Sequence, residues 1–158
     1  MEKEAFLRAV RQDGKRLYLI ALSVTGNHAD AEDVMQNVYL KLWQHAGTFT
    51  DEEHLRKWLT AVCANEAKSL LRAAWRRKSA PLEEAKEQYT FDTPRDAHVF
   101  NAVMALPPKE RAAVHLFYYE DMPVREIAHV LGTSPGAVKT RLSRARKQLK
   151  ESLGDEDL

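Results

Sequence analysis

The sequence feature that most restricts the fold is a pair of short helical patterns within residues 124–150, separated by Gly132. Ala128 in the first pattern is small enough to let a second helix cross closely, and glycine easily adopts the positive φ of a sharp turn. The inward face of the first pattern is apolar: Ile127, Val130 and Leu131. These features predict a helix-turn-helix.

The second helical pattern is basic and has two distinct faces. No acidic residue stands between Glu126 and Glu151, whereas six Lys or Arg residues do. At about 100° per residue, one face is apolar and turns toward a core: Val138, Leu142, Ala145 and Leu149. The opposite front has small and basic side chains that suit a DNA groove: Ser134, Pro135, Gly136, Lys139, Thr140, Ser143, Arg144 and Lys147.

Within this front, Lys139 and Thr140 are placed to reach base edges. Arg144 and Lys147 are placed to reach phosphates. The alternative interpretation is an amphipathic helix whose basic face is only solvated. The turn, the small residues and the acid-free run together favour DNA binding. Either Thr133 or Ser134 can cap the helix.

The composition of the chain favours helices. Its 158 residues include only six Gly and six Pro, and 44% of them are hydrophobic, which is enough for a packed core. The formal net charge is +1, so DNA binding is indicated by the distribution of charge and not by its sum.

The single cysteine, Cys63, excludes an intramolecular disulfide and is interpreted as a small buried residue. The sequence has no signal-peptide core and no apolar stretch of about 20 residues, which predicts a cytoplasmic protein that is not inserted in a membrane.

Hydrophobic spacing divides the chain into two small all-α domains joined by a flexible linker. The N-terminal domain, residues 1–78, has helices predicted at 4–24, 28–45 and 53–78. Residues 79–96 contain two prolines and several acids without a sustained period, and they are interpreted as the linker. The C-terminal domain, residues 97–153, has helices predicted at 97–105, 108–120, 124–131 and 134–152, and residues 154–158 form an acidic tail.

The start of the second predicted helix is acidic. Asn27 can serve as its N-cap, and Asp30 in the first turn suits the helix dipole. The face that Asp30 shares with Asp33 continues at helical spacing: Gln36, Asn37 and Leu40. One interpretation of the acids is dipole compensation and solubility alone. A metal site formed by His28, Asp30 and Asp33 is disfavoured, because no fourth ligand accompanies them.

The third predicted helix mixes aromatic and basic side chains: Arg56, Lys57, Trp58, Lys68, Arg72, Trp75, Arg76 and Arg77. Such a mixture suits an unstacked single strand, because bases stack on aromatic rings and phosphates pair with cations. Trp58 is first a core residue by its spacing with Leu55 and Val62. The preceding loop, residues 48–54, carries Phe49 among acids, so its contacts should be to bases and not to phosphates.

Three motifs, in order along the chain, resemble a known family. Residues 29–43, ADAEDVMQNVYLKLW, resemble the second conserved region of bacterial RNA polymerase sigma factors. Trp58-Leu59, followed by Asn65 and Arg72, resembles the promoter-melting region of the same family. Residues 106–111, LPPKER, together with the helix-turn-helix resemble its fourth region. With no third domain between these regions, the chain resembles the small extracytoplasmic-function (ECF) group over most of its length.

The resemblance implies a sigma factor that binds core RNA polymerase, with no cofactor, no small-molecule substrate and no catalysis of its own. The C-terminal helix-turn-helix would recognise the upstream (−35) promoter element as double-stranded DNA. The N-terminal domain would melt the downstream (−10) element and bind its single strand through Phe49, His54, Lys57, Trp58, Ala61, Asn65, Lys68, Arg72, Arg76 and Arg77. Docking on the largest polymerase subunit would use Asp30, Asp33, Gln36, Asn37 and Leu40. The family also implies an anti-sigma factor as a partner.

Two other classes of protein are weighed against this one. A stand-alone helix-turn-helix regulator needs a signal-binding or dimerisation domain, and no long heptad seam or phosphoacceptor pattern is present. An enzyme is a more distant alternative, because the His and carboxylate residues form no nucleophile–base or metal spacing.

Four aromatic residues are expected to pack in a core or against the linker: Trp43, Trp75, Tyr118 and Tyr119. Three residues are candidates for a groove that holds a polymerase helix, although core packing is favoured for each: Leu116, Phe117 and Tyr118.

Overall fold

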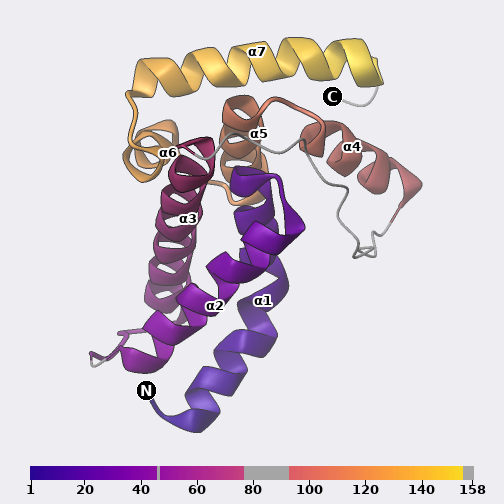
Figure 1. The fold of residues 1–158 in the computed structure, drawn as a ribbon. Helices are drawn as coiled ribbons and strands as arrows, with labels where there is room; N and C mark the ends of the chain where they lie inside the picture. The colour runs from indigo at the N-terminus through magenta and orange to yellow at the C-terminus, as the bar shows by residue number, and fades with distance from the viewer. Residues whose placement is uncertain (46, 77–92, 155–158) are drawn as a thin grey trace. The chain divides into compact units, whose positions relative to one another are not determined.

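The computed structural model describes residues 1–45, 47–76 and 93–154, and every regular element within them is helical (Figure 1). The chain divides into two units, residues 1–84 and 85–158. The predicted all-α fold is therefore confirmed for the described residues. Three sequence predictions lie outside them: the last two positions of the third helix (77–78), most of the linker (79–92) and most of the tail (155–158).

The N-terminal unit consists of α1 (Lys3–Thr25), α2 (His28–Gln44) and α3 (Glu52–Arg76), and each helix packs against the other two. Gly26, with a φ of 71°, ends α1 and donates its N–H to the Leu22 carbonyl at 2.7 Å. Asn27 then caps α2 by accepting the N–H of Asp30 at 2.9 Å, as predicted. The core between the helices is apolar: Leu17, Ile20, Ala21, Val24, Val34, Val38, Leu42, Leu59 and Cys63.

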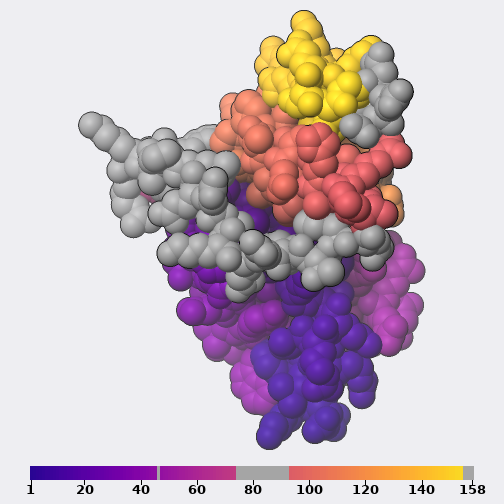
Figure 2. Space-filling view, turned by 90° about the vertical axis from the view of Figure 1, so that its right-hand side faces the viewer, coloured from indigo at the N-terminus to yellow at the C-terminus, as the bar shows by residue number. Residues whose placement is uncertain are grey.

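The C-terminal unit consists of α4 (Pro94–Met104), α5 (Pro108–Val114), the π-helical turn η1 (His115–Tyr119), α6 (Val124–Leu131) and α7 (Pro135–Leu153). Helix α7 packs against α4, α5 and α6, and its contact with α4 is visible in the space-filling view (Figure 2). The residues that α7 buries are the four predicted from spacing: Val138, Leu142, Ala145 and Leu149.

Two elements of the C-terminal unit differ from the sequence prediction. Helix α4 begins at Pro94, so residues 94–96 belong to a helix and not to the predicted linker. The Thr93 hydroxyl accepts the N–H of Asp96 at 3.0 Å, and proline loses no hydrogen bond in the first turn. The predicted helix 108–120 changes to π winding at His115 and ends at Tyr119. Five residues of apolar spacing are too few to distinguish the two windings.

Candidate nucleic-acid interface

The turn between α6 and α7 has the geometry of a helix-turn-helix. Gly132 has a φ of 69°, and Thr133 donates its N–H to the Ala128 carbonyl at 2.9 Å. Ser134 caps α7 by accepting the N–H of Ala137 at 3.1 Å. Of the two predicted caps, Ser134 is therefore the one used, and the positive φ predicted for Gly132 is confirmed.

The surface of α7 opposite its buried stripe, called the α7 front below, consists of Ser134, Pro135, Gly136, Lys139, Thr140, Ser143, Arg144 and Lys147, all exposed. Gly136 and Ser143 are small, which allows a DNA groove to approach the helix backbone closely. The Thr140 hydroxyl donates to the Gly136 carbonyl at 3.1 Å, so its hydrogen is directed back along the helix. The α7 front thus combines small and cationic exposed side chains, a surface that can meet DNA.

The predicted polymerase-docking face on α2 is solvent-accessible. Asp30 is half-buried beside the cap, and the other four residues are exposed: Asp33, Gln36, Asn37 and Leu40. Asn37 donates through Nδ2 to Oε2 of Glu66 on α3 at 3.5 Å, and Lys41 forms an ion pair with the same carboxylate. Glu66 therefore connects this face to α3. Sequence reasoning missed it, because the partners lie on different helices.

The predicted single-strand contacts on α3 differ in exposure. Three are exposed, Lys57, Asn65 and Arg72, and three are half-buried, Trp58, Ala61 and Lys68. Lys57 also pairs with Glu53 at 3.4 Å, but both side chains are largely exposed, so solvent screens the pair. The half-burial of Trp58 is compatible both with core packing and with a contact to a base. Arg77, and the side chains of Trp75 and Arg76, lie outside the described residues.

Four rings meet beside the start of α3 and are called the ring cluster below: His45, Phe49, His54 and Trp58. Sequence analysis singled out the last three and missed His45, which stands at the end of α2. Nothing in the spacing along the chain signals that His45 folds onto the loop. The cluster is accessible to solvent, because His54 is exposed and the other three rings are half-buried.

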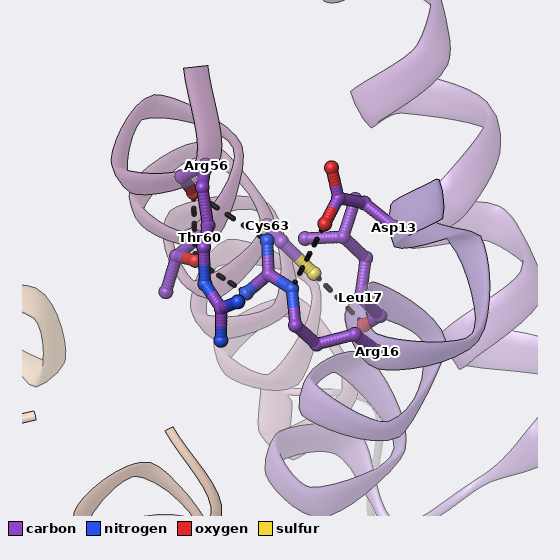
Figure 3. Close-up of polar contacts among 6 residues, drawn as sticks. All are labelled: Asp13, Arg16, Leu17, Arg56, Thr60 and Cys63. Atoms are coloured by element: carbon purple, nitrogen blue, oxygen red, sulfur yellow. Dashed lines mark hydrogen bonds and ion pairs between the residues drawn. The ribbon is translucent and has the colours of Figure 1, made fainter. Parts of the chain in front are cut away.

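Arg16 on α1 holds the first half of α3 in place (Figure 3). Its Nη1 donates to Oγ1 of Thr60 at 2.7 Å, and Thr60 in turn donates to the Arg56 carbonyl at 2.9 Å. Deeper in the core, the Cys63 thiol donates to the Leu17 carbonyl, with Sγ and O 3.2 Å apart. The prediction of a buried cysteine is confirmed. These contacts join α1 to the part of α3 that follows Trp58.

Comparison with known proteins identifies the family. The Sigma-70 region 2 family matches residues 4–77, and the Sigma-70 region 4 family matches residues 99–149. The chain is 30% identical to the ECF RNA polymerase sigma factor SigM of Mycobacterium tuberculosis, across 97% of this chain and 79% of that protein. The chain belongs to the ECF group of RNA polymerase sigma factors. It therefore directs core RNA polymerase to promoters and initiates transcription there.

Solved structures resemble this sigma factor over nearly its whole length. The sigma factor RpoE of Bartonella quintana, in complex with the anti-sigma factor NepR, has a TM-score of 0.72 at 24% identity and covers 97% of this chain and 99% of its own. CnrH, in complex with the cytosolic domain of CnrY, has a TM-score of 0.58 at 26% identity and covers 95% of this chain and 88% of its own. Within the described residues of the sigma factor, no helix is both long and apolar enough to span a membrane.

The metal-site interpretation finds no support in the described part of the sigma factor, where no three His, Cys, Asp or Glu side chains gather as a metal would require. Nδ1 of His28, one of the three residues considered, pairs with the hydroxyl of Tyr18. The Tyr18 and His28 rings also meet edge to face, with centroids 5.7 Å apart. His28 thus joins the start of α2 to Tyr18 on α1.

Three aromatic residues of the sigma factor that were predicted to pack in a core or against the linker are not core residues: Trp43 is 46% exposed, Tyr118 50% and Tyr119 40%. Their packing against the linker stays a prediction, because residues 79–92 lie outside the described residues. Trp43 still contacts the Phe6 ring edge to face, with centroids 5.2 Å apart. Leu116 is fully buried and does not line a groove. Helical spacing identified these residues as apolar but did not show how far the core extends.

Two buried basic residues of the sigma factor, Arg111 on α5 and His115 on η1, have perturbed pKa values. Burial lowers the pKa of Arg111 to about 10 and that of His115 to about 4. The His115 ring stacks on Tyr119 with centroids 5.0 Å apart, and its Nδ1 is buried without a hydrogen-bond partner. Burial, followed by the charge of Asp96, raises the pKa of the Tyr119 hydroxyl. His115 is therefore neutral in the folded C-terminal unit near pH 7.

Proposed function

We propose that the two units of this sigma factor act on different promoter elements. Residues 94–153 read the upstream promoter element, and residues 1–78 melt the downstream element and bind its single strand, while α2 docks on core polymerase. The observation that carries the proposal is the α7 front, where small exposed residues stand between Lys139 and Arg144 on a helix with a buried apolar stripe. Residues of this kind in this order suit the major groove of DNA.

Each unit alone offers few cations to DNA, so its separate affinity is expected to be low and sensitive to salt. Attachment of both units to one polymerase converts the second contact into an intramolecular event and raises the overall affinity. The proposal therefore assigns no catalytic activity to this chain: catalysis belongs to the polymerase. It also places the protein in the cytoplasm, where polymerase and promoters are found.

Run-off transcription with core polymerase tests the proposal. The wild-type chain is expected to produce a promoter-specific transcript, and the Lys139→Ala and Thr140→Ala variants are expected to lose promoter choice while still binding polymerase. Lys109→Ala is a matched control, because Lys109 is an exposed lysine of the same unit on α5. Unchanged promoter choice in both α7 variants would show that the α7 front is assigned wrongly.

The competing function is that of a stand-alone regulator. Such a protein would bind a palindromic site tightly without polymerase and would give no promoter-specific transcript. Gel-shift titrations with and without core polymerase separate the two functions. The sigma-factor proposal expects tight binding only in the presence of polymerase.

An anti-sigma factor is the second partner that we propose. The sigma factor RpoE of Bartonella quintana was solved in complex with the anti-sigma factor NepR, and CnrH, which is 26% identical to this chain, was solved in complex with the cytosolic domain of CnrY. A protein that binds both units would block the α7 front from DNA and the α2 face from polymerase at the same time. Purification of the tagged chain from its native host, followed by mass spectrometry, is expected to recover one stoichiometric small protein in addition to polymerase. Recovery of polymerase alone under non-inducing conditions would contradict this part of the proposal.

A further inference from the structure

The Phe49 ring of the ring cluster lies against a second ring, that of His45. Their centroids are 4.6 Å apart and their planes differ by 16°, which is the geometry of stacking. Trp58 and His54 meet Phe49 edge to face instead, at 5.4 Å and 5.1 Å. Within the ring cluster, His45 is thus the ring that lies parallel to Phe49.

Local hydrogen bonds hold this arrangement in the free protein. His45 ends α2 and donates its N–H to the Leu42 carbonyl at 3.2 Å. On the other side, the His54 N–H donates to Oδ1 of Asp51 at 2.8 Å, and its Nδ1 accepts the N–H of Thr50 at 3.1 Å. The His45 ring also lies 4.9 Å from Trp58. His45 therefore approaches Phe49 from the capped end of α2, and its ring also contacts that of Trp58.

A nucleobase that stacks on an aromatic side chain adopts the same parallel geometry at the same separation. His45 already occupies that position on Phe49. We infer that the His45 imidazole is an internal competitor, which an unpaired base of the downstream promoter strand must displace before it can stack on the face of Phe49 that His45 covers. The inference rests on the proposed function, because it takes Phe49 as a base-binding residue.

Histidine suits this role for a physical reason. The imidazole ring is smaller and more polar than a phenyl or indole ring, so it stacks more weakly and is readily solvated once displaced. It covers Phe49 when no base is present, and a base with a larger π-surface replaces it. A single strand that cannot place an unpaired base at Phe49 therefore gains no binding affinity from this site.

The test uses holoenzyme and a promoter fragment that the wild-type holoenzyme has selected in vitro, with its downstream element left single-stranded. The His45→Ala variant is expected to bind this probe about 3- to 10-fold more tightly, because the stacking competitor is removed. His45→Phe is expected to bind more weakly than wild type, because a phenyl ring stacks more strongly on Phe49. Weaker or unchanged binding by His45→Ala overturns the inference.

Two further variants separate this inference from the proposed function. Phe49→Ala is expected to weaken binding, and the double variant with His45→Ala is expected to show no gain. If Phe49→Ala weakens binding but His45→Ala does not strengthen it, the competitor role fails and the base-binding role of Phe49 remains. If Phe49→Ala changes nothing, both fail at this site. His98→Ala is the matched control, an exposed histidine in the other unit that is expected to leave affinity unchanged.

Discussion

Arg146 donates a hydrogen bond through Nε to the hydroxyl of Tyr118 at 2.7 Å, and this bond joins the DNA-facing helix α7 to the π-helical turn η1. The guanidinium carbon also lies 5.8 Å from the centroid of the Tyr118 ring and 6.0 Å from that of Phe117. Arg146 is therefore one basic residue of α7 that is turned toward the protein and away from the α7 front. Its role is expected to be structural.

Substitutions of two arginines on α7 should separate structure from DNA binding. Arg144→Ala is expected to weaken promoter binding by holoenzyme and to reduce its salt dependence by about one phosphate contact. Arg146→Ala should leave both nearly unchanged but lower the free energy of unfolding of the C-terminal unit by about 0.5–1 kcal/mol, because its hydrogen bond is solvent-accessible. Fluorescence anisotropy at several salt concentrations measures the first effect, and thermal unfolding the second. An equal loss of salt dependence in both variants would place Arg146 on DNA.

The bond between Arg16 and Thr60 should contribute measurably to the stability of the N-terminal unit. Thr60→Val preserves the shape of the side chain but removes the acceptor 2.7 Å from Nη1 of Arg16, so we expect a loss of about 1–2 kcal/mol. Thr48→Val is the control, since Thr48 is exposed. All three tryptophans lie in residues 1–84, so urea unfolding followed by tryptophan fluorescence reports on this unit alone. Equal stability of the two variants would contradict the assignment.

His115 should make the stability of the C-terminal unit depend on pH. Its pKa is about 4 in the folded state and about 6.5 in an unfolded chain, so only the unfolded state binds this proton between these values. Stability is fully present above pH 6.5 and falls as the pH drops toward 4, by about 3 kcal/mol in total. Hydrogen exchange of the α5 and α7 amides, corrected for intrinsic rates, measures how the free energy of unfolding of this unit changes with pH. The His115→Leu variant should abolish this pH dependence, and the His98→Leu variant should retain it.

The sequence predicted most of this fold because local signals were strong and consistent. Caps at Asn27 and Ser134, and the glycine turn at Gly132, fixed where helices begin and end. The features that escaped prediction depend on which side chains of different elements meet in the folded chain, even where the two residues are close in sequence. Neither the stacking of His45 on Phe49 nor the bond from Arg146 to Tyr118 leaves a periodic trace in the chain, because each joins side chains from different elements. The π winding at His115 also has no distinctive spacing.

The α2 face should bind polymerase through charge as well as shape. Asp33→Arg is expected to weaken association with core polymerase by at least 10-fold, on the order of 1.4 kcal/mol, without loss of helical signal. Glu32→Arg is the matched control: Glu32 is also exposed on α2, but it is about 100° away from Asp33 around the helix. Surface-immobilised core polymerase allows both affinities to be measured. If the two variants weaken binding equally, net charge and not the face formed by Asp33 determines association.

The hydroxyl of Thr140 should determine which base the α7 front accepts at one position. It donates its hydrogen to the Gly136 carbonyl at 3.1 Å, so only the lone pairs of its oxygen remain for DNA, and the oxygen can act there as an acceptor. In the major groove the matching donors are the amino groups of cytosine and adenine, whereas guanine presents only acceptors. We therefore expect an amino-bearing base opposite Thr140, with a preference of about 1–2 kcal/mol over guanine.

Two conservative variants of Thr140 test this assignment. Thr140→Ser retains the oxygen and loses the methyl group, so it should keep the preference for an amino-bearing base. Thr140→Val retains the shape and loses the oxygen, so it should lose that preference while phosphate contacts maintain the overall affinity. Selection of upstream elements from randomised DNA by each holoenzyme, followed by sequencing, gives the preference directly. The reverse pattern, with valine retaining the preference and serine losing it, would show that the methyl group contacts thymine and that the hydroxyl does not read the base.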